Sequence, residues 1–272
     1  MARIVVEIPG ERAYDVVVSA GQIDRLGAEM RAFDTNQKAL IITDTEVAER
    51  YLDPAKASLK QVGYQVSVIT VPAGESAKSV ECASEIWHAM VECGLNRDSV
   101  VVALGGGVVG DLAGFIAATY MRGVPFVQLP TSLLAQVDSS VGGKVAVNHA
   151  LGKNLIGAFY QPKAVFMDLD MMKTLPKREI ATGLGEIIKY GIIYDQEFFK
   201  FLENNKTKVL ALESDAVSYM IARSCEIKAA VVSKDEKESG LRRILNFGHT
   251  MAHAIEKETG YIRYNHGEAV AI

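Results

Sequence analysis

The chain has 272 residues, of which 49% are hydrophobic and 23% charged, with a formal net charge of −4 and a pI near 5.8. These values are typical of a globular protein of one or two domains, and they disfavour a nucleic-acid binder, which needs clustered lysine and arginine in excess. No apolar run reaches membrane-spanning length, and the start, MARIVVEIPGER, lacks the apolar stretch of a secretion signal. We therefore expect a cytoplasmic protein that acts on small molecules, with neither a nucleic acid nor a membrane as partner.

The cysteines argue against a disulfide framework. Cys82, Cys93 and Cys225 are odd in number and form no CxxC pair. Neither paired disulfides nor a cysteine zinc knuckle is therefore expected, and we interpret all three as reduced thiols.

Strand and helix patterns alternate as far as Ser132. Two β-branched stretches, 3–9 and 14–21, predict an antiparallel hairpin at a sheet edge. The later patterns predict strands at 39–44, 64–71, 99–107 and 125–132 and helices at 22–33, 45–63, 76–94 and 111–121. Such alternation implies a parallel sheet with helices on both faces, and ligands bind such sheets beyond the carboxyl ends of the strands. The loops expected to carry function are 43–46, 72–78, 105–111 and 130–144.

The pattern becomes helical from about Thr174. Helices are predicted at 178–193, 195–205, 216–236 and 247–260. The last residues, HGEAVAI, resemble an opening helix with no terminating residue, so we expect that a C-terminal portion is missing. The predicted organisation is an α/β domain at 1–173 and an all-α domain at 174–272, which we expect to be truncated at its C-terminus.

A glycine loop follows the third strand of this parallel series. Gly105, Gly107 and Gly110 fit G-x-G-x-x-G between a predicted strand and a predicted helix, where backbone N–H groups can approach a pyrophosphate. A tight packing turn is the alternative. The next strand carries no acid to bind a ribose, and the acid nearest in role is Asp44. A Walker loop is excluded, because the residues around Lys144 lack its leading glycine and following Ser or Thr.

Three residues of the helical part are candidate metal ligands. Glu186, His249 and His266 offer a carboxylate and two imidazoles, which leave one position of a catalytic zinc site open. His249 and His253 lie one helical turn apart, but threonine follows His249, so the metalloprotease H-E-x-x-H is absent. A packed or surface role is the usual one for any single histidine. Clustering favours a site, since three of the five histidines lie in the last part of the chain.

Several basic residues lie beside glycines or small polar residues. A substrate with both a phosphate and a carboxylate would need several such donors, although a solvated surface charge is the alternative for each one. The candidates are Lys144, Lys153, Lys189, Lys228, Arg122 and Arg242.

Long motifs in a fixed order then carry a resemblance. They are GGGVVGDLAGF, ATYMRGVPFVQLPTSLLAQVDSSVGGKVAVN, GKNLIGAFYQP, GLGEIIKYG, RRILNFGHTMAHAIE and NHGEAVA. Together they resemble the 3-dehydroquinate synthase family over nearly the whole chain. The resemblance implies a homodimer that binds NAD in the N-terminal domain and zinc, or alternatively cobalt, in the helical domain. It also implies further helices beyond Ile272, one of which contributes a lysine.

Motif by motif, the resemblance implies roles for individual residues. The implied zinc ligands are Glu186, His249 and His266. The implied NAD contacts are Asp44, Glu75, Lys78, Gly105, Gly106, Gly107, Val108, Asp111, Thr131, Ser132, Lys144, Lys153 and Thr174. The implied substrate-binding and catalytic residues are Arg122, Asp138, Lys144, Asn154, Lys189, Lys228, Arg242, Asn246 and His253.

The family is a lyase of the shikimate pathway to aromatic amino acids. It converts 3-deoxy-D-arabino-heptulosonate 7-phosphate into 3-dehydroquinate and phosphate by transient oxidation with NAD, phosphate elimination, re-reduction and internal aldol closure. We hypothesise that His253 takes part in proton transfer, with the leaving phosphate as the alternative base. Three rivals stay open: another sugar-phosphate cyclase, a glycerol-type metal-dependent dehydrogenase, and a non-catalytic nucleotide-binding relative. Lys144, Lys228 and Arg242 favour the sugar acid.

Overall fold

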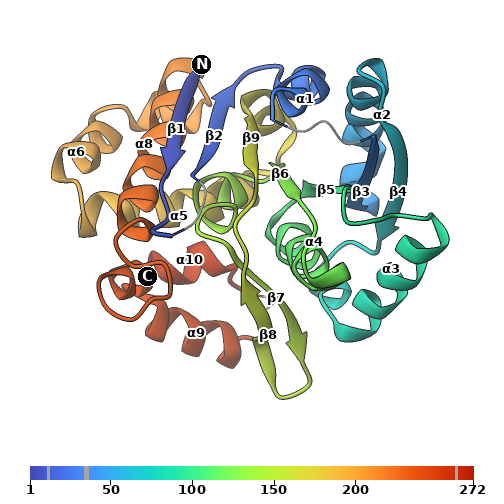
Figure 1. Ribbon diagram of the computed structural model, residues 1–272. Coiled ribbons are helices and arrows are strands. Elements are labelled where there is room, and N and C mark those ends of the chain that lie inside the picture. The colour runs from blue at the N-terminus through green and yellow to red at the C-terminus, as the bar shows by residue number, and fades with distance from the viewer. Residues whose placement is uncertain (11–12, 34–36, 261–262) are drawn as a thin grey trace. The chain divides into compact units, whose positions relative to one another are not determined.

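The computed structural model describes residues 1–272 except 11–12, 34–36 and 261–262 (Figure 1). Two units have their own internal packing: one contains residues 1–19, 132–142 and 169–272, and the other contains residues 20–131 and 143–168. The division expected from the sequence, between residues 173 and 174, treats each domain as one continuous stretch. It stays a prediction.

A parallel sheet forms the centre of the unit that contains residues 20–131. Its strands β3 (Lys38–Asp44), β4 (Gln65–Val71), β5 (Val100–Gly105), β6 (Phe126–Pro130) and β9 (Ala164–Asp168) lie in the order β9-β6-β5-β3-β4. Strands β5, β6 and β9 are buried along their whole length, as expected when helices cover both faces of a parallel sheet. The prediction of a parallel α/β sheet is confirmed, and the strand before the glycine loop is central in this series.

Four helices cover this parallel sheet. Helices α1 (Gln22–Arg31) and α2 (Thr45–Gln61) pack against each other on one face, and α3 (Val80–Glu92) and α4 (Gly107–Thr119) cover the other (Figure 1). Helix α2 continues through Pro54. Both faces of the sheet are therefore covered by helices, which is the doubly wound arrangement.

Two helix starts differ from the prediction. Helix α3 begins at Val80 because the Ser79 side chain caps it, accepting a hydrogen bond from Cys82 N at 3.1 Å; residues Glu75–Ala77 form a separate 3-10 turn. Helix α4 begins inside the glycine loop, at Gly107, and not at 111. The loop is therefore shorter than predicted: Gly105 is the last residue of β5, Gly106 is the N-cap of α4, and Gly107 is its first residue.

A β-hairpin and the last strand of the parallel sheet were not predicted. Strands β7 (Lys144–His149) and β8 (Gly152–Phe159) pair antiparallel, and β9 follows them. Most side chains of β8 are exposed, so the strand has little of the apolar alternation by which strands are recognised.

The other unit is mainly helical. Its N-terminal hairpin pairs β1 (Ala2–Val6) with β2 (Tyr14–Ser19) in antiparallel register, which confirms the predicted hairpin. Helices follow at α5 (Lys177–Ile193), α6 (Gln196–Asn204), α7 (Lys206–Leu210), α8 (Ser214–Val232), α9 (His249–Glu258) and α10 (His266–Val270), with 3-10 segments η4 (Leu169–Thr174) and η5 (Leu241–Asn246). The prediction of a helical C-terminal part is confirmed.

Part of the predicted loop 130–144 is helical. Residues Ala135–Ser139 form a π-helical turn, η3, which packs against α5 and α8. Such turns are rare in proteins, and those that do occur are often found at functional sites. Asp138, a residue expected to contact substrate, lies in this turn.

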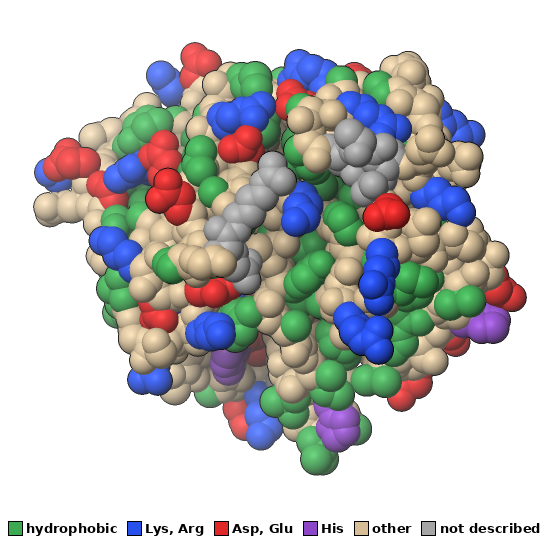
Figure 2. Space-filling view, in the orientation of Figure 1, with side chains coloured by type: hydrophobic (Ala, Val, Ile, Leu, Met, Phe, Trp, Pro, Cys, Tyr) green, Lys and Arg blue, Asp and Glu red, His purple; other side chains and the backbone are tan. Residues whose placement is uncertain are grey.

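The surface carries both signs of charge. On the face shown in Figure 2, acidic and basic side chains are interspersed. Within the described residues, no helix is both long and apolar enough to cross a membrane.

Candidate functional site

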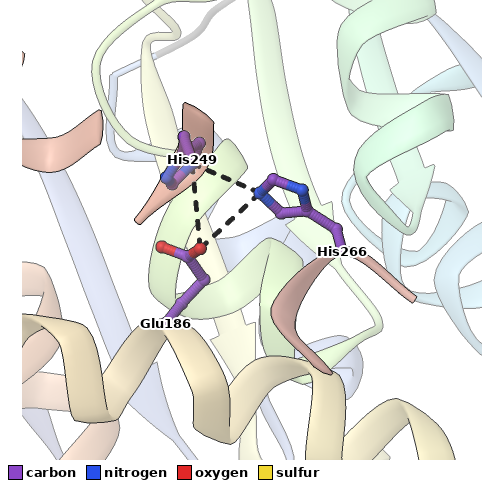
Figure 3. Close-up of side chains that lie close together, drawn as sticks. All are labelled: Glu186, His249 and His266. Atoms are coloured by element: carbon purple, nitrogen blue, oxygen red, sulfur yellow. Dashed lines mark hydrogen bonds and ion pairs between the residues drawn. The ribbon is translucent and has the colours of Figure 1, made fainter. Parts of the chain in front are cut away.

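The three candidate metal ligands converge within the helical unit. Glu186 lies on α5, and its side chain has 0% exposure; His249 and His266 are the first residues of α9 and α10. Figure 3 shows both imidazoles directed at the Glu186 carboxylate. Glu186 Oε1 lies 3.9 Å from His249 Nε2 and 3.6 Å from His266 Nε2, and the two Nε2 atoms are 3.3 Å apart.

These separations suit a divalent cation. Tetrahedral coordination with bonds of about 2.0–2.2 Å places donor atoms roughly 3.3–3.6 Å from one another. The two separations from His266 Nε2 lie in this range, and the separation of Glu186 Oε1 from His249 Nε2, 3.9 Å, is slightly longer. Lys189 pairs with Glu186 Oε2, whereas Oε1 is buried and has no hydrogen-bond partner among the described residues. A buried oxygen of this kind is unfavourable unless a proton or a metal ion binds it. The donor set therefore fits a metal ion with one coordination position left for a substrate oxygen.

The electrostatic environment keeps His249 neutral. Burial and the nearby Lys189 charge lower the pKa of His249 to about 4. A neutral imidazole has a lone pair for a metal, and the contact of His249 Nδ1 with Phe247 O at 3.2 Å assigns the ring proton to Nδ1. Burial and the Asp138 charge raise the pKa of Glu186, against the opposing pull of Lys189.

Two glycines allow α5 and α10 to approach closely. A Cβ at Gly185 would overlap with Gly267 O, and a Cβ at Gly267 would overlap with Thr182 O. The start of α10 is fixed by a capping box, in which Glu268 accepts a hydrogen bond from Asn265 N at 2.8 Å. The GLGE and HGE motifs thus place His266 beside Glu186 through backbone contact.

Replacing Gly267 with alanine tests this contact. The new Cβ must push α10 away from Thr182, so we expect the free energy of unfolding to fall by about 1–3 kcal/mol and the metal affinity to fall at least about tenfold. Urea unfolding and competition with a chromophoric chelator measure the two effects. Gly152→Ala is the control, because its Cβ meets only the Leu155 side chain, at 3.1 Å. Parent-like metal affinity in Gly267→Ala would contradict the role of the close approach.

A second polar cluster surrounds Asp138. Lys228 Nζ donates hydrogen bonds to Asp138 Oδ1 at 2.5 Å and to its carbonyl at 2.7 Å, and Tyr190 Oη donates to Oδ1 at 2.8 Å. Burial acts to raise the pKa of Asp138, but the charges of Lys228 and Lys189 outweigh it and hold the pKa well below its usual range. Lys189 also pairs with Glu186 and donates to Leu245 O at 2.7 Å. Lys189 therefore links this cluster to the candidate metal site.

The other basic and amide side chains of this unit that were predicted to bind substrate donate hydrogen bonds to oxygen atoms of the protein itself. Arg242, 2% exposed, donates to Gly142 O at 3.0 Å and to the Glu236 carbonyl, and Asn246 donates to the Glu238 carboxylate. The assignment of Lys228, Arg242 and Asn246 to the substrate stays a prediction.

The other predicted residues of this unit have local contacts. His253 is exposed on α9, with its ring 5.7 Å from that of His249 and 5.9 Å from that of His266. Ser132 Oγ accepts a hydrogen bond from Ala135 N at 3.2 Å, and Thr174 Oγ1 donates to Met171 O at 3.0 Å. Only His253 among these three therefore lies against the candidate metal ligands.

Several predicted nucleotide contacts lie at one edge of the parallel sheet. Asp44, Gly105 and Thr131 end or follow the neighbouring strands β3, β5 and β6, and Thr131 N donates to Gly105 O at 2.9 Å. Gly106 is the N-cap of α4 and offers no side chain, and Val108 lies in the first turn, which leaves the helix N-terminus suited to an anion. Asp44 has a structural role as well, since its carboxylate caps α2 by accepting from Glu46 N and Val47 N, both at 3.0 Å.

A buried lysine joins the glycine-loop helix to the β-hairpin. Lys78 Nζ donates to Asp111 Oδ2 and to Asn154 Oδ1, both at 2.5 Å, and Asn154 has a left-handed φ of 58°. Asn148, also in the hairpin, donates to Glu75 Oε1 at 2.8 Å. The structure thus places a predicted substrate residue, Asn154, with two predicted NAD contacts, Lys78 and Asp111.

The remaining predicted residues of this unit are exposed. Lys144 begins β7, Lys153 lies on β8, and Arg122 ends a short 3-10 turn with a left-handed φ of 69°. Their roles stay predictions.

Two residues that contact the predicted site residues were not predicted. Tyr190 binds Asp138, and Glu256 Oε2 lies 3.4 Å from His266 Nδ1. A signal for Glu256 was present, because His249, His253 and Glu256 have the i, i+4, i+7 spacing of one helix face. Tyr190 lies in an apolar helical stretch that gave no such signal.

A doubly wound sheet with a glycine loop at its carboxyl edge, and a carboxylate with two imidazoles in a helical unit, are features of the metal-dependent enzymes with a nucleotide-binding α/β domain. Family models described as 3-dehydroquinate synthase N-terminal and C-terminal match residues 68–182 and 183–272. The 3-dehydroquinate synthase of Citrifermentans bemidjiense is 52% identical over 96% of this chain and 72% of its own length. The chain belongs to the 3-dehydroquinate synthase family, which confirms the predicted resemblance.

Solved structures agree with the fold. A 2-deoxy-scyllo-inosose synthase complexed with carbaglucose-6-phosphate, NAD+ and Co2+ has a TM-score of 0.91 at 27% identity, covering 99% of this chain and 72% of that one. The 2-epi-5-epi-valiolone synthase ValA of Streptomyces hygroscopicus subsp. jinggangensis, with NAD+ and Zn2+ bound, has a TM-score of 0.85 at 31% identity, covering 96% and 72%. The predicted fold class is confirmed.

Proposed function

We propose that this protein converts 3-deoxy-D-arabino-heptulosonate 7-phosphate into 3-dehydroquinate and phosphate, using NAD and zinc. The convergence of Glu186, His249 and His266 supports the metal requirement, and the identity to 3-dehydroquinate synthases supports the substrate. Glu186 Oε1 and the two Nε2 atoms would hold the ion. When bound, a zinc ion supplies Lewis-acid stabilisation of charge on a substrate oxygen, and NAD supplies the hydride acceptor and donor.

The protein's own residues would hold the reactants and control charge. Lys189, buried at 3% exposure between Glu186 and Leu245 O, brings a fixed positive charge next to the candidate metal ligands. Such a charge favours a substrate anion at the open coordination position. His253, exposed beside His249 and His266, is the candidate to hold or move a substrate proton at its imidazole nitrogen.

The glycine loop is the proposed site of the nucleotide pyrophosphate. Backbone amides of the first turn of α4, from Gly107, would donate to phosphate oxygens at the positive end of the helix. Lys78 and Asp111 are placed to fix that turn by their ion pair. Zinc in preference to cobalt, a homodimer and a cytoplasmic location stay predictions.

The direct test is phosphate release from the heptulosonate phosphate with NAD present. We expect release that stops when a chelator removes the metal and returns when zinc or cobalt is added, because the charge on the substrate oxygen loses its stabilisation. We also expect no accumulation of reduced nicotinamide, since NAD is regenerated in each cycle.

Two outcomes favour the rival functions. Net accumulation of reduced nicotinamide during turnover identifies a dehydrogenase of the glycerol type. Turnover of phosphorylated sugars without a carboxylate, in preference to the heptulosonate phosphate, identifies another sugar-phosphate cyclase. Catalysis by the unsubstituted protein without any bound metal would refute the proposed mechanism.

A further inference from the structure

The two nitrogens of His266 face different groups. Nε2 lies 3.6 Å from Glu186 Oε1 and 3.3 Å from His249 Nε2, whereas Nδ1 lies 3.4 Å from Glu256 Oε2. Glu256 is 8% exposed and belongs to α9, the helix that begins with His249. An ionised carboxylate accepts hydrogen bonds and cannot donate one. The proton of a neutral His266 is therefore assigned to Nδ1, the nitrogen that faces Glu256.

His249 repeats the same arrangement. Its Nδ1 lies 3.2 Å from the Phe247 carbonyl, an acceptor, and its Nε2 faces the same Glu186 oxygen at 3.9 Å. Both imidazoles thus have an acceptor at Nδ1 and a lone pair at Nε2. Acceptors of this kind fix the tautomer and orientation of metal-bound histidines.

We propose that Glu256 is a positioning residue that holds His266 with its Nε2 lone pair directed at the metal; this rests on the metal site of the proposed function. Glu256 follows His249 by seven residues on α9, so the two side chains share one face of the helix. Helix α9 therefore supplies one ligand directly and orients the second. The capping box of α10 fixes the backbone of His266 but leaves the rotation of its ring to Glu256.

The geometry also offers a second role for Glu256, as a metal ligand. Ligand atoms of His253, Glu256 and His266 lie within 4.8 Å of one another and could hold an ion of their own. His266 would then give Nδ1 to that ion, and the two ions would share its ring. The arrangement of His249, whose Nδ1 faces a carbonyl, favours the positioning role because one explanation covers both imidazoles.

Zinc affinity provides the test, measured on the purified protein by competition with a chromophoric chelator. We expect Glu256→Ala to bind zinc about 10–100-fold more weakly than the parent. Glu256→Gln keeps an acceptor oxygen at the same reach, so its affinity should lie within about threefold of the parent. Glu258→Ala is the matched control, because Glu258 is exposed on the same helix. The visible spectrum of the Co2+-substituted protein should change in Glu256→Ala and not in Glu258→Ala.

The results separate the alternatives. Urea unfolding of the metal-free variants controls for loss of fold. If Glu256 had a purely structural role, Glu256→Ala would be less stable than the unsubstituted protein even without metal, and Glu256→Gln would be no more stable than Glu256→Ala. Parent-like zinc affinity in Glu256→Ala, or a glutamine variant as weak as the alanine variant, overturns the proposal. Two zinc ions per parent chain, one of them lost in Glu256→Ala, would make Glu256 a ligand. A parent that binds no metal overturns the proposed function and this inference together.

Discussion

Substituting Glu186 by glutamine is expected to abolish stable zinc binding and to lower turnover by about 10³-fold. The Glu186 carboxylate is the anionic member of the three candidate ligands, and its Oε1 lies within 3.9 Å of the Nε2 atoms of His249 and His266. A neutral amide oxygen is a weaker ligand for zinc. A zinc ion held there would contribute several kcal/mol of transition-state stabilisation, which corresponds to a rate factor of this size. Elemental analysis after dialysis and phosphate release measure the two losses, and NAD affinity should be unchanged.

A second variant keeps this test independent of folding. The Glu186 side chain is fully buried beside Lys189, so Glu186→Gln leaves a buried ammonium without its partner. His249→Ala removes a ligand and leaves that ion pair intact. His88→Ala is the control, because His88 is a histidine on α3 whose side chain is 76% exposed. Parent-like zinc content in either Glu186→Gln or His249→Ala would refute the ligand assignment.

The parallel sheet was predictable because its strands are unusually apolar. ALIITD, SVVVAL and PFVQLP are almost continuous buried runs, and each is followed by polar or glycine-rich residues where the strand ends. The hairpin β7–β8 was not predictable in this way, since β8 exposes most of its side chains. Its residues depend on pairing with β7, a tertiary interaction that local pattern does not report.

The ligand set was predictable only in part from the residues themselves. Clustered histidines indicated a metal site, but Glu186 is far from His249 in the sequence, and only the motif resemblance joined them. The physical reason for their convergence is the contact of α5 and α10 at Gly185 and Gly267, which a sequence pattern does not measure. The hydrogen bonds of Lys228 and Arg242 to protein oxygens were not predictable, because a basic residue in a motif has the same sequence pattern whether it binds substrate or protein.

Replacing Lys228 with methionine is expected to lower the free energy of unfolding by about 1–3 kcal/mol at pH 7, because it leaves Asp138, whose side chain is 26% exposed, without its main counter-charge. Zinc content should not change, since neither residue is a candidate ligand. Lys234→Met is the control, because Lys234 is exposed just beyond the end of α8. Urea unfolding measures the difference, and a loss below about 1 kcal/mol would contradict a stabilising ion pair between Lys228 and Asp138.

The pH dependence of stability provides a second, independent test of the Lys228→Met prediction. In the parent, Lys228 and Lys189 overcome the effect of burial and hold the pKa of Asp138 well below its ordinary value of 3.8. A carboxylate with a depressed pKa stabilises the folded protein above that ordinary value, and the contribution is lost as the pH falls. Without Lys228 the pKa of Asp138 rises, so this contribution shrinks in the variant. The difference in free energy of unfolding between the unsubstituted protein and Lys228→Met should therefore be largest near pH 7 and should decrease below about pH 3.8. A difference that does not vary with pH would show that lost packing, and not lost charge, destabilises the variant.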